Sequence, residues 1–165
     1  MNILADLGIH VFERGWLSSN NVLCVGAESH TLVDTGYVDH ANQTVELVES
    51  ALTKPLTAIV NTHLHSDHCG GNAALQRKFP GVETWVPSPS FDAVQDWDGD
   101  ALTYAVTGQS CPPFTATHRY QAGDRLRMGD IEWRAYAAMG HDPDAMLLFQ
   151  AEHRILISGD ALWGN

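Results

Sequence analysis

The sequence predicts an α/β protein whose residues 1–165 form one layered domain. The first observation is the order of its central segments: an apolar strand at Leu56–Val60, a polar loop, a short helix, and a second strand at Val82–Val86. This order is typical of layered α/β domains. The second observation is the composition, because 44% apolar and 18% charged residues suit a globular chain that is long enough to bury a core.

The first third of the chain predicts three short strands followed by a helix. Residues 9–12, 21–25 and 30–34 are apolar or alternating runs with turn-forming residues between them, which indicates a β-meander that opens the first sheet. From about His40 to Leu52 the apolar residues recur at helical spacing. Pro55 follows this helix closely and ends it.

The middle of the chain predicts a helix that begins at Asn72 as its N-cap and continues to Phe79. Residues 87–114 are rich in proline and aspartate, and they indicate one or two short helices near residues 91–97 and 101–106. This segment forms either a substrate lid that uses Trp97 and Tyr104 or a surface excursion whose aromatic residues cap the core. Long loops are often functional but not always, so the sequence leaves both interpretations open.

The last third predicts antiparallel hairpins. Residues 119–121, 124–128 and 131–136 alternate and are separated by turns that contain glycine. Residues 145–149 and 154–157 predict another hairpin.

The most informative stretch is the polar loop itself, Asn61 to Gly71, which places three histidines and one aspartate within six residues. It leaves the C-terminal end of a strand, the edge at which ligands collect in α/β folds. In an extended segment alternate residues point the same way, so His63, His65 and Asp67 could converge, and a turn at the glycines could add His68. Imidazoles and a carboxylate suit zinc, and also iron or manganese. The competing interpretation is a polar surface loop, which we disfavour because histidine is scarce.

These residues resemble a known family. The pattern H-x-H-x-D-H after an apolar strand is similar to the metallo-β-lactamase-fold hydrolases. Thr31–Gly36 resembles the upstream strand that ends in Asp-Thr-Gly in that family. Gly140–Pro143 resembles the downstream Gly-His segment, and Ile155–Asp160 resembles the strand that ends in Gly-Asp. The resemblance extends from about Leu7 to the last residue.

The resemblance implies a dinuclear metal site and the role of each ligand. It places His63, His65 and His141 on one metal ion, Asp67 and His68 on a second, and Asp160 between the two. It also implies that Asp67 is catalytic, either by orienting the attacking water or by passing a proton to the leaving group. By the same resemblance Asp34 supports the site without being a ligand. Asp142 and Asp144 flank His141 and either orient a ligand imidazole or form an ordinary turn.

The resemblance also refines the expected fold to a metallo-β-lactamase-like αββα sandwich of two mixed sheets. Family members continue beyond the residue that matches Asp160, so the single domain at 1–165 is expected to be incomplete at its C-terminus, truncated before the C-terminal helices. Without those helices the second sheet would expose an apolar face. Either this chain is a piece of a longer protein, which we favour, or a second copy covers that face as a homo-oligomer.

The function that the resemblance implies is a zinc-dependent hydrolase with one or two ions. A metal-bound hydroxide would attack an ester, thioester, lactone or related bond in a small-molecule substrate. The first alternative is an iron-dependent enzyme on the same fold that acts on oxygen or sulfur. The second alternative is a catalytically incomplete fragment that serves as an interaction domain.

Bulk properties restrict the partners. A net charge of −11 argues against nucleic acid and against anionic membrane surfaces, because both attract basic proteins. The sequence has no apolar run long enough for a membrane span and no signal peptide at its N-terminus, so we expect a cytoplasmic protein. Cys24, Cys69 and Cys111 have no paired spacing, and reduced thiols are the simplest interpretation.

Overall fold

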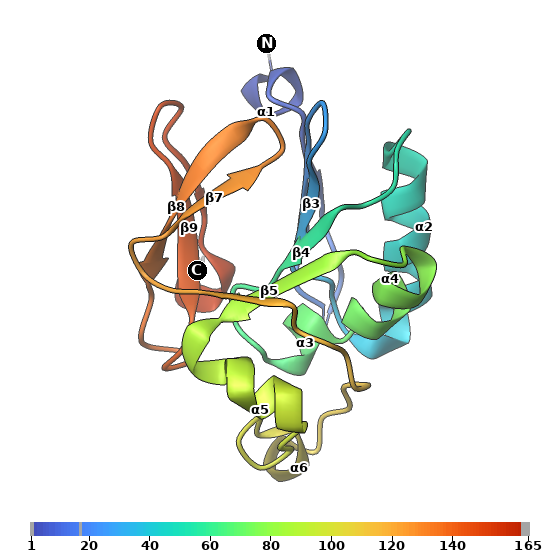
Figure 1. Ribbon diagram of the computed structural model, residues 1–165, viewed down its shortest axis with the longest axis vertical. Helices are drawn as coiled ribbons and strands as arrows, with labels where there is room; N and C mark the ends of the chain where they lie inside the picture. The colour runs from blue at the N-terminus through green and yellow to red at the C-terminus, as the bar shows by residue number, and fades with distance from the viewer. Residues whose placement is uncertain (1, 17, 163–165) are drawn as a thin grey trace.

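A computed structural model describes residues 2–16 and 18–162 of the chain. Residues 1, 17 and 163–165, which the predicted domain includes, lie outside the described residues. The chain forms two β-sheets that pack face to face, with helices on the outer side of the first sheet (Figure 1). The predicted layered α/β fold is therefore confirmed.

The first sheet has six strands in sequence order. Its first three strands are antiparallel and its last three each run parallel to the preceding one, so this sheet is mixed as predicted. Its strands are β1 (Ile9–Phe12), β2 (Asn21–Val25), β3 (His30–Val33), β4 (Ala58–Val60), β5 (Glu83–Pro87) and β6 (His118–Tyr120).

The second sheet has four strands in the order β10-β9-β8-β7, and all of its described pairings are antiparallel rather than mixed. Short hairpins join neighbouring strands, which is the connection that antiparallel pairing allows. Its strands are β7 (Arg125–Met128), β8 (Ile131–Ala137), β9 (Met146–Gln150) and β10 (Ile155–Ile157).

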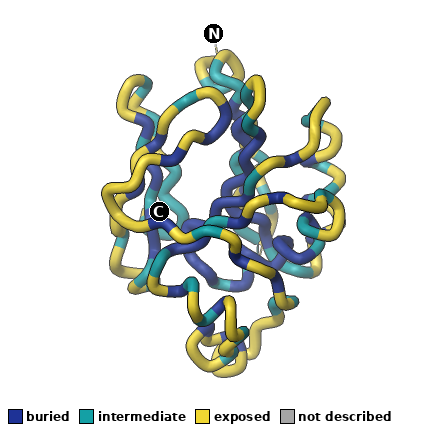
Figure 2. Tube along the Cα trace, viewed as in Figure 1, coloured by how far each residue is buried: buried dark blue, intermediate teal, exposed yellow. Residues whose placement is uncertain are grey.

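Alternation along the strands of the first sheet divides the core into two layers. Leu23, Leu32 and Ile59 face helices and belong to one apolar cluster. Their neighbours Val33 and Val60 face the second sheet and pack with residues such as Trp133, which is fully buried. Successive side chains of a strand point to opposite faces, so each central strand contributes to both layers. Figure 2 shows the buried residues concentrated along these strands.

The helical layer consists mainly of α2 (Ala41–Ala51) and α4 (Asn72–Lys78), which contribute Val48 and Leu75 to the outer cluster. The smaller helical elements are α1 (Ile3–Asp6), α3 (Ser66–Cys69) and the 3-10 turns η1 (Val38–His40) and η3 (Gly159–Ala161). No helix in the described part of the chain is both long and apolar enough to cross a membrane.

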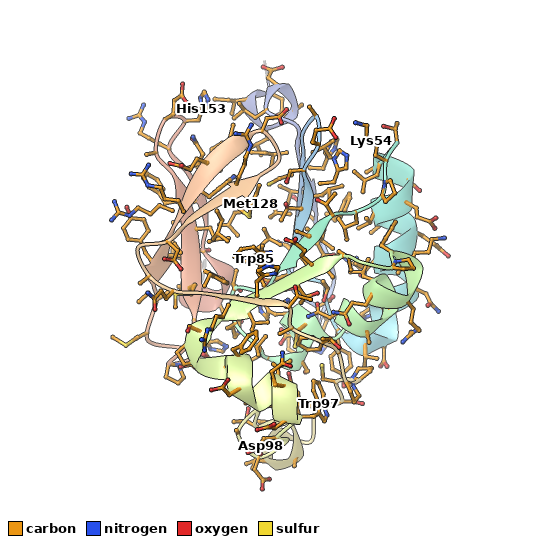
Figure 3. All side chains as sticks on the ribbon, viewed as in Figure 1. Lys54, Trp85, Trp97, Asp98, Met128 and His153 are labelled. Carbon is orange, nitrogen blue, oxygen red and sulfur yellow. The ribbon has the colours of Figure 1, made fainter. Side chains whose placement is uncertain are left out.

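Residues 88–117 connect β5 to β6 as an insertion at one end of the molecule (Figure 1). It contains η2 (Ser88–Ser90), α5 (Phe91–Asp96) and α6 (Tyr104–Thr107). Trp97 packs against Tyr104 and against Phe114 within the insertion. Figure 3 shows Trp97 at this end of the molecule. The insertion therefore has an apolar cluster of its own, which also includes Leu64 and Cys69 of the histidine-rich loop.

Three local predictions are wrong. Residues 119–121 do not form a hairpin with the next strand, because β6 pairs in parallel with β5 in the first sheet. Asn72 is not an N-cap: it is the first residue of α4, and its side chain bonds to Asn61 and Thr35 instead. The second helix of the insertion begins only at Tyr104, after a turn at 101–103. The first two errors have the same cause, since a distant residue supplied a partner that local sequence does not reveal. The third is local, because Thr103 has a left-handed backbone with φ of 62°.

Candidate metal centre

The histidine-rich loop begins where β4 ends, as the sequence predicts. His63 and His65 follow the strand directly, and His65 immediately precedes α3, in which His68 lies. His141 comes from the loop between β8 and β9, and Asp160 comes from η3 after β10. Both sheets therefore deliver side chains to one place.

Two groups of possible metal donors converge there. The ligand atoms of His63, His65 and His141 lie within 4.8 Å of one another. The ligand atoms of His63, His68 and Asp160 lie within 4.8 Å of one another as well. Because His63 belongs to both groups, they form one continuous cluster.

Short distances connect the members of the two groups. His65 Nδ1 lies 3.0 Å from His141 Nε2. Asp160 lies between the groups: its Oδ1 is 3.2 Å from His68 Nε2 and its Oδ2 is 3.3 Å from His141 Nε2. The hydrogen bond with His68 holds the pKa of Asp160 below its ordinary value, although burial opposes this. Asp160 is therefore a carboxylate at neutral pH.

His63 is the most buried member of the cluster, with 1% of its surface exposed. Burial, followed by the neighbouring His68 and His65, lowers its pKa to about 2, so the ring is neutral. Its Nε2 has no hydrogen-bond partner among the described residues, whereas its Nδ1 lies 3.2 Å from Thr62 Oγ1. A buried imidazole nitrogen without a partner is costly, and a metal ion would satisfy it.

Asp34 orients the His68 ring through a hydrogen bond to its Nδ1. Its carboxylate accepts hydrogen bonds from the backbone N–H and the hydroxyl of Thr62, both at 2.8 Å. Its Oδ2 lies 2.8 Å from His68 Nδ1, which leaves Nε2 facing Asp160. Burial lowers the pKa of His68, but Asp34 and Asp160 outweigh it and raise that pKa to about 10. An imidazole fixed by a carboxylate at its second nitrogen is the usual support of a metal-ligating histidine.

Asp67 is the predicted residue that the structure does not bring into either group. Its nearest approach to the cluster joins its Oδ2 to His68 Nε2 at 3.8 Å. The chain becomes helical at Ser66, so the alternation that aligns His63 with His65 does not continue to Asp67. The ligand and catalytic roles of Asp67 stay predictions.

Sequence reasoning missed the polar residues that hold the loop in place. Asn61 donates from its side chain to the carbonyl of His68 at 3.1 Å and accepts from Asn72 at 2.7 Å. Thr35 donates to Asn72 at 2.8 Å. The signal that could have found them is a run of polar residues directly after two apolar strands, since such residues need partners when they are buried.

Asp142 and Asp144, whose roles the sequence leaves open, have different partners. Asp142 Oδ2 lies 3.4 Å from His65 Nε2, so its carboxylate faces a candidate ligand. Asp144 accepts a hydrogen bond from Ser90 of the insertion at 2.9 Å. The remaining histidines join neither donor group; His118, for example, stacks on Trp85 with ring centroids 4.3 Å apart.

Two hollows open beside the cluster. A cavity of about 290 Å³ lies between His65 and His141 on one side and the insertion on the other, with Leu64, Ala93 and Leu102 among its apolar walls. A groove of about 310 Å³ reaches Asp34, His68 and Asp160 from the side of β1 and β10. The cavity thus gives a small molecule access to His65 and His141, and the groove gives access to His68 and Asp160.

The donor set fits a metal ion. Neutral imidazoles and carboxylates are ligands of zinc, iron and manganese, and the arrangement here contains an unpartnered buried nitrogen that points into the cluster. Asp34, a carboxylate outside both groups, holds the His68 imidazole by a hydrogen bond, which is the usual support of a metal-ligating histidine.

Comparisons with known proteins identify the family of the chain. The model of the metallo-beta-lactamase superfamily matches residues 14–165. The human acyl-coenzyme A thioesterase MBLAC2 is 27% identical over 96% of this chain and 65% of its own. The anaerobic nitric oxide reductase flavorubredoxin of Aliivibrio fischeri is 28% identical over 87% of this chain and 27% of its own.

Solved structures support the same fold. A mutant metallo-beta-lactamase from Cronobacter sakazakii matches with a TM-score of 0.71 and 25% identity, over 86% of this chain and 55% of that one. The chain thus spans less than two thirds of the length of each of these three proteins. Because the family model matches well over half of the sequence, the chain belongs to the metallo-beta-lactamase superfamily.

Proposed function

We propose that this chain is the metal-binding part of a hydrolase that acts on an ester, thioester or lactone bond of a small molecule. The observation that carries the proposal is the convergence of two donor groups on His63, whose Nε2 has no partner among the described residues. Zinc is the metal that we propose first, because imidazoles with a carboxylate are its usual ligands.

When bound, a metal ion would supply Lewis acidity at the carbonyl oxygen next to the bond to be broken. The protein residues have separate tasks around it. Asp34 fixes the His68 ring so that its Nε2 faces the cluster, and Asp142 faces His65 from the opposite side. Asp67, half-exposed at the start of α3, is our proposed carrier of a proton to the leaving group.

The cavity beside His65 and His141 is the proposed binding site for the acyl portion of the substrate. Apolar residues form much of its wall, including Leu64, Ala93 and Leu102, and no lysine or arginine lines it among the described residues. The titratable groups that line it among the described residues are the carboxylates of Asp142 and Asp144 and the imidazoles of His65 and His141. These walls favour a neutral acyl group over one that ends in a carboxylate or phosphate.

The relatives support hydrolysis without choosing the substrate. The human relative is named as an acyl-coenzyme A thioesterase, which is a hydrolase of thioesters. Its 27% identity supports the reaction class, and fold-level likeness alone would not do so.

A second candidate function is iron-dependent redox chemistry. Imidazole and carboxylate ligands also suit iron, and the flavorubredoxin relative is named as an anaerobic nitric oxide reductase. The identity of the bound metal distinguishes this candidate from the first.

The first experiment measures metal content by elemental analysis on protein purified without chelators or an affinity metal column. We expect one to two equivalents of zinc in the wild type. His63→Ala removes the shared donor and should lower the metal content at both groups.

His10→Ala is the matched control, because His10 is exposed on β1 and belongs to neither group. Iron near one equivalent would favour the second candidate, and no metal after reconstitution would contradict both.

The second experiment measures hydrolysis by zinc-loaded protein. Matched p-nitrophenyl esters and acyl thioesters with neutral chains should be cleaved faster than their counterparts whose acyl chain ends in a carboxylate. Ala93→Trp fills the proposed acyl cavity and should slow the longer neutral chains most. A metal-loaded wild type that cleaves none of these compounds would contradict the hydrolase proposal.

A further inference from the structure

Two cysteines from distant parts of the chain meet beside the metal centre. Cys69 Sγ and Cys111 Sγ lie 3.7 Å apart, although 42 residues separate them in sequence. Cys69 is fully buried at the end of α3, directly after the candidate ligand His68. Cys111 is partly exposed in the connection between α6 and β6. One residue of the pair is therefore partly exposed to solvent and the other is not.

Hydrogen bonds on both sides of the Cys69–Cys111 contact hold the two segments together. Tyr104 of the insertion donates its hydroxyl hydrogen to the carbonyl of Leu64 at 2.9 Å, and the same oxygen lies 3.2 Å from Cys69 Sγ. Ser66 of α3 also donates to Gln109, two residues before Cys111. The segments that carry the two thiols are thus held together on both sides of the pair.

The third cysteine is excluded from this arrangement. Cys24 lies in β2 and packs in the core between the two sheets, with 1% of its surface exposed. Burial raises its pKa to about 12, so it stays a thiol and is a poor nucleophile. The hydrogen bond from Cys69 instead lowers the pKa of Cys111. Cys111 is therefore the thiol of the three that is best placed to react first.

We propose that Cys69 and Cys111 form a reversible intramolecular disulfide when the protein meets hydrogen peroxide. The sulfur of Cys111 attacks one peroxide oxygen, the O–O bond breaks, and a sulfenic acid and one water result. The Cys69 sulfur then attacks the Cys111 sulfur, its thiol proton leaves with the hydroxyl as a second water, and the S–S bond forms. Two thiols lose two electrons and two protons, and the peroxide is reduced to two waters.

The local structure allows the bond to close. A disulfide needs its sulfur atoms about 2.05 Å apart, so the pair must approach from its present distance. Residues 108–117 contain neither helix nor strand, which leaves Cys111 free to make that approach while α3 stays in place. The product would bond the histidine-rich loop to the insertion that lines the acyl cavity. This inference concerns thiol chemistry alone and does not depend on the proposed hydrolase activity.

The test treats the full chain with a slight excess of hydrogen peroxide and then alkylates the remaining thiols. Intact mass should show the loss of two hydrogen atoms and of two alkylation sites, and both changes should reverse with dithiothreitol. Trypsin cleaves after Arg14, Arg77, Lys78 and Arg119 but not between Lys54 and Pro55. The disulfide should therefore join peptide 15–77 to peptide 79–119.

Two variants identify the partners. Peptide 15–77 also contains Cys24, so the cross-linked peptide must persist in Cys24→Ala and disappear in Cys111→Ser. The oxidised wild type should unfold at a temperature roughly 5–15 °C higher than its reduced form, because the bond closes a loop of 42 residues. Cys111→Ser should show no such rise.

Three results would overturn the inference. They are addition of oxygen atoms to Cys111 without loss of hydrogen, a disulfide that joins two chains, and a cross-link that requires Cys24. Each would show that the two neighbouring thiols do not react with one another.

Discussion

Asp34 shows how one residue can decide the chemistry of the site. It has a left-handed backbone with φ of 55°, which directs its carboxylate toward both Thr62 and His68. Its side chain is almost completely buried, so each of its hydrogen bonds is shielded from water. The strained backbone and the buried charge are both costly, and they persist because the carboxylate is satisfied by three donors.

We predict that Asp34→Asn weakens metal binding by about 10- to 100-fold while the chain still folds. Asparagine tolerates the left-handed backbone and can still accept the bond from Thr62. Its amide, however, presents a donor to His68 Nδ1 and favours the tautomer whose proton lies on Nε2, the nitrogen that faces Asp160. Competition against a chelator of known affinity measures the change.

The control for this prediction is Asp39→Asn, which removes the same charge from an exposed position on η1. Its metal affinity should match that of the wild type. Equal weakening in both variants would mean that net charge, and not the orientation of His68, governs affinity.

Only some residues of the candidate site can be predicted from the sequence. His63, His65 and His68 lie within six residues, so the sequence alone indicates a metal site. His141 lies 76 residues after His65, and no local pattern joins the two. The resemblance to a family indicates His141 and Asp160, whereas the support from Thr62 and Asn61 is visible only once the chain is folded.

At the scale of elements, the junction of α3 and α4 packs closely on the turn after β3. Gly71 lies at this junction, where its N–H donates to the carbonyl of Gly36 at 3.2 Å. A Cβ atom on Gly71 would lie 2.5 Å from the backbone oxygen of Thr35, which cannot move away as a flexible side chain could. The close approach fixes the direction in which the histidine-rich loop leaves β4.

We therefore predict that Gly71→Ala lowers the free energy of unfolding by about 1–3 kcal/mol or more, as overpacking does. The backbone must shift to admit the methyl group, and the shift would also disturb the neighbouring helix that carries His68. Urea denaturation of the metal-free protein measures the loss without any contribution from bound metal.

Gly99→Ala is the matched control, because a Cβ atom at Gly99 meets no atom within 4 Å. Its free energy of unfolding should stay within about 0.5 kcal/mol of the wild type. Similar losses in the two variants would show that the effect comes from the loss of glycine and not from the contact with Thr35.

The insertion is joined to the histidine-rich loop by a second element-scale contact. We predict that Tyr104→Phe lowers the free energy of unfolding by about 1–3 kcal/mol, because the buried carbonyl of Leu64 loses its hydroxyl donor. Tyr136→Phe is the control, since Tyr136 is 41% exposed on β8. Thermal unfolding of both variants gives the comparison. An unchanged free energy of unfolding in Tyr104→Phe would mean that water replaces the hydroxyl as the donor to Leu64.

Element order is predictable from this sequence because apolar runs and turn residues are local signals. The pairing of strands is harder to predict from the sequence, and β6 is an example. Residues 118–120 alternate like the strands that follow them, yet they pair in parallel with β5 across the whole insertion. In this pairing Trp85 and His118 lie in register and their rings stack, a contact between residues 33 positions apart that no local pattern indicates.

At the scale of the whole molecule, the metal centre joins the two sheets. His63, His65 and His68 follow a strand of the first sheet, whereas His141 and Asp160 follow strands of the second. Between the sheets, Trp85 and Met128 line a cavity of about 450 Å³ (Figure 3). The sheets are thus packed tightly in the core around Trp133, less tightly near this cavity, and brought together again at the candidate ligands.

This arrangement predicts that metal binding stabilises the fold as a whole. A ligand that binds only the folded chain stabilises it by about 2.7 kcal/mol at a concentration 100 times its dissociation constant. For a chain of this size that corresponds to a rise of roughly 5–10 °C in the unfolding temperature. Removal of the metal with a chelator should reverse the rise, and differential scanning calorimetry measures both steps.

Histidine variants test whether the stabilisation comes from metal bound where the two sheets meet. His63→Ala removes the donor that both groups share, so chelator should leave its unfolding temperature unchanged, while His10→Ala should respond as the wild type does. His141→Ala removes a donor of the second sheet only, and any metal retained by His63 and His68 with Asp160 would still join the two sheets. An intermediate response from His141→Ala therefore indicates two ions that act in parallel, whereas a complete loss indicates that one ion depends on the other.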